Sequence, residues 1–173
     1  MQARTLRQAA ALVVLVFAAG PAAAQNAGSD WLIVPGVGIG AVRLGMPVAD
    51  ALRIAGPTQD AYSQGVGPAT GGRLYYWFTT QGSRTAQTND GGRVGTLGVF
   101  GDPEFATPGG LRVGSTPADV EQAMGAPSRV SRDDAQDRTQ FIYDGSGIAF
   151  VVGGDPARVA GILVFEPGTR GTP

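Results

Sequence analysis

The chain of 173 residues contains no cysteine, no histidine and no lysine. Without cysteine, no disulfide can stabilise the fold, so a packed hydrophobic core has to hold it together. The lack of histidine and lysine excludes Ser–His and Ser–Lys nucleophile–base pairs and histidine metal sites. We therefore predict a protein that is not an enzyme and that uses neither a cofactor nor a metal ion.

Charged residues are few and nearly balanced, with 13 arginines against 14 acidic residues. Two arginines lie within residues 1–24, so residues 25–173 carry 11 basic and 14 acidic residues, a formal net charge of −3. Nucleic acids and anionic membranes attract proteins that present a basic surface. The charge balance therefore argues against either of these as a partner.

Residues 1–24 have the layout of a secretory signal peptide. Two arginines precede an apolar run, Ala9–Ala19, which is too short to span a bilayer, and the small residues Ala22–Ala24 follow it. We expect cleavage near Ala24–Gln25 and a periplasmic or secreted mature protein. No cysteine follows the run for lipid attachment, so we expect no stable membrane anchor in the mature chain.

One stretch of sequence occurs twice. Val42–Thr58 reads VRLGMPVADALRIAGPT, and Leu111–Ser128 reads LRVGSTPADVEQAMGAPS. Each copy predicts a short helix, over Pro47–Ala55 and over Pro117–Met124, because proline suits the first turn and glycine the end of a helix. In the second copy Thr116 is the expected N-cap. An internal repeat of this kind indicates a tandem arrangement.

Strand-like segments follow each helix, separated by glycine- and asparagine-rich turns. After the first helix these are Thr58–Ser63, Arg73–Thr80, a weak Arg84–Thr88, and Val94–Phe100. After the second they are Ser128–Arg132, Arg138–Tyr143, Gly147–Val152 and Arg158–Phe165, and a further strand is expected at Trp31–Val34. We predict an α+β fold of two tandem repeats, each a short helix packed on a three- or four-stranded antiparallel sheet.

The repeat also sets the expected organisation of the chain. We assign repeat 1 to residues 31–100, a linker to 101–110, repeat 2 to 111–166 and a flexible tail to 167–173. Some 149 residues follow the leader, which is enough for a single domain or for two small units sharing an interface.

The pattern G-x-[ST]-x-x-[DE]-V-x-x-x-x-G-x-P spans Gly114 to Pro127, and the first copy carries a partial form from Gly45 to Gly56. In this pattern the chain resembles the small exported α+β module of β-lactamase inhibitory protein and of SmpA/OmlA-type outer-membrane assembly lipoproteins. The resemblance implies a fold of helix and antiparallel strands, but its motif residues start and stop a helix. No binding residue is carried over from it.

Two other patterns have a local explanation. The glycines of Gly36–Ala41 could belong to a dinucleotide fingerprint, but no helix follows them directly, so we interpret them as a turn. The acids Asp133, Asp134, Asp137 and Asp144 could attract Ca²⁺, but they lack the spacing of a calcium loop and are flanked by arginines. We interpret them as a solvated hairpin or loop.

The segment RLYYWF at Arg73–Phe78 is the strongest candidate for a binding surface. Strand alternation places Arg73, Tyr75 and Trp77 on one face, and Phe141 and Tyr143 share a face of the matching strand. Aromatic residues and arginine anchor protein interfaces. Either this face is the open side of the sheet and holds a partner, or it is covered and belongs to the core.

The leading hypothesis from the sequence is an exported, non-enzymatic protein-binding module. It would act as an inhibitor of an exported enzyme or as an envelope-assembly accessory. Two alternatives stay open, namely a small envelope enzyme using paired carboxylates and a small-molecule carrier with a pocket between the repeats.

Overall fold

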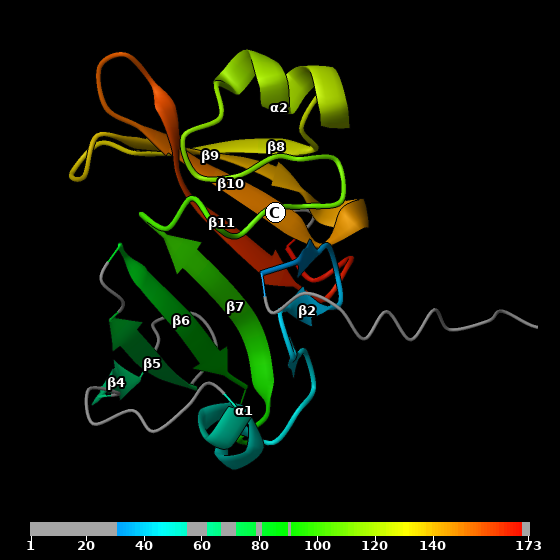
Figure 1. The fold of residues 1–173 in the computed structure, drawn as a ribbon, viewed down its shortest axis with the longest axis vertical. Helices are drawn as coiled ribbons and strands as arrows, with labels where there is room; N and C mark the ends of the chain where they lie inside the picture. The colour runs from blue at the N-terminus through cyan, green and yellow to red at the C-terminus, as the bar shows by residue number, and fades with distance from the viewer. Residues whose placement is uncertain (1–30, 55–61, 67–71, 79–80, 90, 171–173) are drawn as a thin grey trace, which may run out of the picture.

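The computed structural model describes residues 31–54, 62–66, 72–78, 81–89 and 91–170 (Figure 1). The signal peptide predicted at residues 1–24 lies outside the described residues. The described chain is mixed α+β and is dominated by sheet, with one sheet of eight strands and one of three.

The large sheet is antiparallel throughout. Its strands are β4 (Tyr62–Val66), β5 (Arg73–Phe78), β6 (Ser83–Thr88), β7 (Val94–Phe100), β8 (Arg129–Asp133), β9 (Arg138–Tyr143), β10 (Ile148–Gly153) and β11 (Arg158–Phe165). The predicted bounds of β7, β9 and β11 are confirmed to the residue. Regular alternation and well-marked turns explain this accuracy.

The strand order in the large sheet is β4-β5-β6-β7-β11-β10-β9-β8. Strands β7 and β11 are neighbours in the middle of the sheet, with Val99 opposite Ile162. The four strands that follow the first helix therefore join those that follow the second edge to edge. The prediction of a separate three- or four-stranded sheet for each helix is wrong in this respect, because strand edges pair through backbone groups that any sequence carries.

The helices are α1 (Val48–Ile54) and α2 (Pro117–Met124). The predicted cap of α2 is confirmed, since the Thr116 hydroxyl accepts a hydrogen bond from the Asp119 N–H and the Asp119 carboxylate accepts one from the Thr116 N–H. Neither helix in the described part of the chain is long and apolar enough to cross a bilayer.

The three-stranded sheet comprises β1 (Ile33–Val34), β2 (Gly38–Ile39) and β3 (Val42–Arg43), in the order β1-β2-β3. The sequence predicts a turn over Gly36–Ala41 and does not indicate the strand β2 there. Such short strands are weak alone, but β2 contacts both β7 and β11. The small sheet therefore covers the junction between the two sets of strands.

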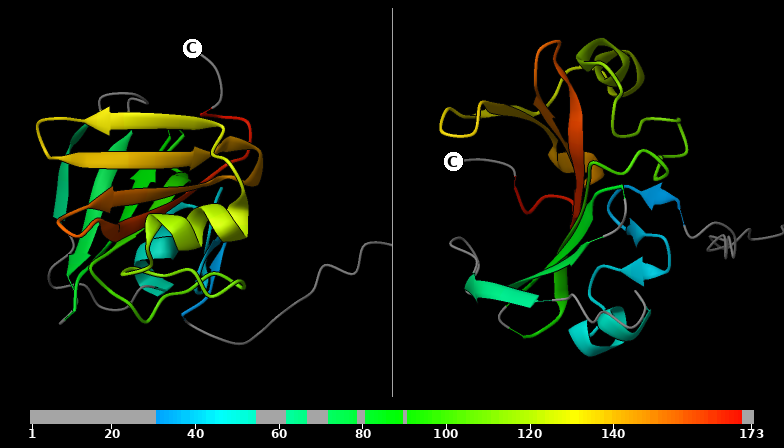
Figure 2. Two further views of the ribbon diagram at one scale, coloured as in Figure 1. Left: turned by 90° about the horizontal axis from the view of Figure 1, so that it is seen from above. Right: turned by 60° about the vertical axis from the view of Figure 1, so that its left-hand side comes forward.

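Both helices and the small sheet lie on one face of the large sheet, as its edge-on view in Figure 2 shows. We call this the covered face. The large sheet curves so that its other face, which we call the open face, is concave (Figure 2). Eighteen buried residues form the main core on the covered face, among them Phe150, Ile162 and Val164. The segment predicted as a linker contributes Phe105, which is 1% exposed.

Candidate functional site

The alternation predicted for β5 is observed. However, the face that the binding hypothesis assigned to a partner is the covered face. Trp77 is only 5% exposed, and Tyr75 is half-buried and packed against the main core. Leu74, Tyr76 and Phe78 lie on the open face instead. The small sheet and α1 cover this side, so the alternative that assigned it to the core is the one observed. The core needs large apolar side chains beneath these elements.

The matching residues of β9 are also on the covered face. Tyr143 is 6% exposed, and its hydroxyl donates a hydrogen bond to the Gly125 carbonyl at 3.0 Å. Phe141 is half-buried and packs on the same core. Among the five residues predicted to form a partner-binding surface, Arg73 alone is exposed, so that aromatic surface is wrong as predicted.

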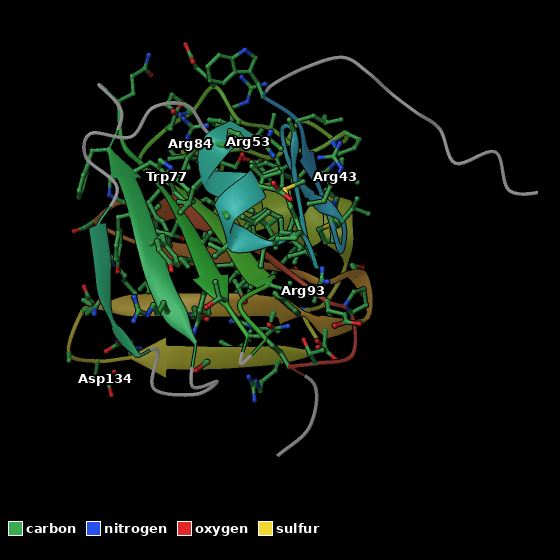
Figure 3. All side chains as sticks on the ribbon, turned by 90° about the horizontal axis from the view of Figure 1, so that it is seen from below. Arg43, Arg53, Trp77, Arg84, Arg93 and Asp134 are labelled. Carbon is green, nitrogen blue, oxygen red and sulfur yellow. The ribbon has the colours of Figure 1, made fainter. Side chains whose placement is uncertain are left out.

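Trp77 and Arg84 face each other on β5 and β6 on the covered face, next to α1 (Figure 3). Their Nε1 and Nε atoms are buried and have no hydrogen-bond partner among the residues that the structure describes. Both side chains line a cavity of about 30 Å³, together with apolar residues such as Ile39 and Leu97. A space of this size holds a water molecule or two and is too small for an organic ligand.

The open face is hollow at its centre because several inward positions carry small side chains. Directly opposed residues of an antiparallel pair share a face, so Thr85, Gly98 and Leu163 form one row across β6, β7 and β11. A Cβ atom at Gly98 would lie 2.4 Å from the Thr85 Oγ1, and one at Gly161 would lie 2.2 Å from the Phe100 ring. The two glycines let neighbouring side chains lie flat on the sheet.

The hollow has a volume of about 450 Å³ and receives residues from both sets of strands. Its described lining is Leu74, Tyr76, Ser83, Thr85, Gln87, Thr96, Phe100, Arg138, Leu163 and Arg170. The apolar and aromatic members provide contact area, and the hydroxyl, amide and guanidinium groups provide hydrogen bonds. The volume is within the range of pockets that bind drug-sized molecules.

Two arginines line the hollow, and the described lining contains no acidic residue. The Arg170 guanidinium donates a hydrogen bond to the Thr96 Oγ1 at 3.2 Å and lies over the Phe165 ring at 4.6 Å. Burial lowers the pKa of Arg170, the nearby Arg129 lowers it further, and Asp144 opposes the shift. The hollow is therefore a positively charged site.

The C-terminal segment brings Arg170 to this place. The Asp144 carboxylate accepts a hydrogen bond from the Arg170 N–H at 2.7 Å, and the Gly168 N–H donates to the Asp144 carbonyl. A flexible tail was predicted for residues 167–173, but residues 167–170 are held against the sheet by these bonds. Residues 171–173 lie outside the described chain.

Asp133, Asp134 and Asp137 are exposed at the turn between β8 and β9, as the sequence predicted, whereas Asp144 lies apart from them and binds the C-terminal segment. The Asp133 carboxylate accepts hydrogen bonds from the N–H groups of Ala135 and Gln136, and Arg132 pairs with Asp134 at 2.7 Å. No cluster of three or more potential metal ligands occurs among the described residues.

The residues of the hollow were not predicted from the sequence as a site. Strand alternation places Tyr76, which lines the hollow, and its exposed neighbour Phe78 on the second face of the RLYYWF strand. The sequence could therefore indicate this part of the site. Nothing in the sequence indicated that Phe100, Arg138 and Arg170 would line the same hollow, because they come from three distant segments of the chain.

No protein-family model matches the chain, and no curated protein matches it either. A solved structure of a DUF4309 family protein, YjgB from Bacillus subtilis, is similar at a TM-score of 0.46 and 19% sequence identity. The match covers 68% of this chain and 76% of that one.

Proposed function

We propose that this protein is an exported, non-enzymatic protein-binding module that holds its partner on the open face of the large sheet. The observation that carries the proposal is the hollow of about 450 Å³ and its aromatic border. Phe78 is 55% exposed, and its ring is stacked with that of Tyr76 at 6.4 Å. Exposed aromatic side chains beside a concave site are typical anchors of protein interfaces.

A protein segment suits this surface better than a small molecule does. A small ligand within the hollow would leave Phe78 exposed to water, because that residue is not part of the hollow's lining. A partner that lies across the concave face would bury Phe78 and fill the hollow together. The position of the site between the two sets of strands also gives a partner a broad surface to contact.

We further propose that the two sets of strands are tandem copies of one module. The order β4-β5-β6-β7 on one side of the junction is matched by β8-β9-β10-β11 counted inward from the other edge. Each set follows a helix of similar sequence, Val48–Ile54 or Pro117–Met124. The resemblance to β-lactamase inhibitory protein and the SmpA/OmlA-type modules leads us to propose two roles, enzyme inhibitor or envelope-assembly accessory.

Photo-crosslinking tests the proposed binding surface directly. We would replace Phe78 by p-benzoylphenylalanine and, as a matched control, the exposed Gln122 of α2. After expression with the native leader, irradiation should link a discrete protein to the Phe78 variant and none to the Gln122 variant. A product shared by both variants, or no product from Phe78, would contradict the proposal.

The size of the hollow also favours a second candidate, a carrier of a small anionic molecule. Native mass spectrometry of the protein purified from its own host would reveal a retained ligand. A stoichiometric small ligand that is lost when Ser83 is replaced by leucine, which fills the hollow, would support the carrier. The described lining of the hollow contains no carboxylate, so this site does not support the alternative of an enzyme that uses paired carboxylates.

A further inference from the structure

We propose that the hollow recognises a carboxylate side chain of the protein partner, with an adjoining apolar residue held against Tyr76, Phe100 and Leu163. This inference rests on the proposed protein-binding function and specifies its chemistry. It assigns the central role to Arg170, which enters the hollow from the C-terminal segment.

Charge is the first observation behind the inference. Neither arginine of the hollow has a carboxylate within 4.0 Å among the described residues, since the ion pairs of the described chain involve Arg53 and Arg132. Arg170 is half-buried, and its pKa is lowered by burial. Asp144 is the nearby carboxylate, but it bonds the Arg170 backbone N–H and makes no ion pair with the guanidinium. A partly buried guanidinium with no carboxylate in direct contact gains more from an incoming anion than a fully hydrated one does.

Hydrogen bonding is the second observation. A guanidinium has five N–H donors and no acceptor. In the described chain the Arg170 side chain donates to Thr96 at 3.2 Å, which leaves donors for a ligand. Arginine matches a carboxylate well because two parallel N–H groups can donate to its two oxygens.

The apolar wall decides between a carboxylate side chain and a free inorganic anion. The hollow is far larger than phosphate requires, and Leu74, Phe100 and Leu163 have no hydrogen-bond donor to offer a fully charged anion at that wall. The methylene stem of glutamate and a neighbouring apolar residue would cover these side chains and remove them from water. A partner segment that contains an acidic residue and an aromatic residue would contact both the arginine and the apolar side chains of the hollow.

Two peptides test the inference, acetyl-Ala-Glu-Phe-Ala-amide and its Gln analogue, titrated into ¹⁵N-labelled protein at low salt. We expect the Glu peptide to bind about tenfold more tightly, as charge-assisted hydrogen bonds predict, with shifts at Thr96 and Arg170. Arg170→Gln should reduce the preference to about twofold or less. The matched control Arg112→Gln, which alters an exposed arginine outside the hollow, should leave it unchanged.

Several results would overturn the carboxylate inference. Equal affinity for both peptides would do so, as would the absence of saturable shifts with the Glu peptide at about 10 mM. Competition by inorganic phosphate at equal concentration would show that the site takes any anion. If the Phe78 variant still cross-links a partner in these cases, protein binding stands and only the carboxylate is wrong. If the cross-link is also absent, the proposed function fails with it.

Discussion

The two faces of the large sheet are built from the same strands but differ sharply in packing. On the covered face Phe150, Ile162 and Val164 are completely buried beneath helices and the small sheet. On the open face Phe78 is 55% exposed and the centre is hollow. The comparison indicates that one face forms the packed core while the other leaves side chains exposed to solvent. Substitutions on the two faces should therefore have different effects.

The largest contrast should come from removing one phenylalanine ring from each face. Phe150→Ala should destabilise the protein by about 3–5 kcal/mol, because the fully buried ring leaves a cavity next to Tyr143. Phe78→Ala should change the free energy of unfolding by only about 0.5 kcal/mol, as exposed substitutions usually do. Urea unfolding of both variants measures the difference, and similar losses would refute the assignment of the faces.

A smaller effect should come from filling the floor of the hollow. Gly161→Ala should cost about 1–3 kcal/mol, because the new Cβ would lie 2.2 Å from the Phe100 ring and force it aside. Gly95→Ala is the matched control, since its Cβ would be at least 3.6 Å from the three nearest atoms. Removing this glycine should be neutral or stabilise by about 0.4–1 kcal/mol. Equal melting temperatures for the two variants would show that Phe100 does not rest on Gly161.

One hydrogen bond links the end of α2 to the sheet, and it should contribute about as much to the free energy of unfolding as a typical hydrogen bond does. Tyr143→Phe removes the donor to the Gly125 carbonyl and should cost about 1 kcal/mol. Tyr75→Phe on the same face is the control, because no hydrogen bond of its hydroxyl occurs within the described residues. A loss of equal size in both variants would mean that the bond from Tyr143 contributes nothing specific.

The smallest effect should be the pH dependence of the α2 cap. Hydrogen bonds from Thr116 lower the pKa of Asp119 below its ordinary value of 3.8, and Arg158 contributes further. The folded state therefore binds this proton less well than the unfolded state does. The stabilisation is complete above pH 3.8 and is lost as the pH falls through the folded pKa.

Asp119→Asn removes this titration. The variant should be less stable than the wild type at pH 7, and the difference should shrink as the pH is lowered below about 4. Urea unfolding at several pH values measures it. A difference that stays constant down to pH 2 would show that the carboxylate charge is not what stabilises the cap.

Much of the local structure could be predicted from the sequence. The cap at Thr116, the helix over Pro117–Met124 and the bounds of β7 depend on neighbouring residues, and each is observed as expected. The site could be predicted only in part. Alternation correctly divided Arg73–Phe78 into two sets of side chains, but it carries no information about which set is covered. That depends on the small sheet at Ile33–Arg43, whose weak strands gave little signal.

By itself, the sequence determined the α+β content, the helix starts and stops, the partition of each strand into two faces, and the dependence on a packed core. The tertiary structure alone decided that β7 and β11 join the strands into one curved sheet, which face is covered, and which distant residues line the hollow. The physical reason is that caps and alternation act over a few residues. Strand edges instead pair through backbone hydrogen bonds that any sequence provides, so distant segments come together only in the folded chain.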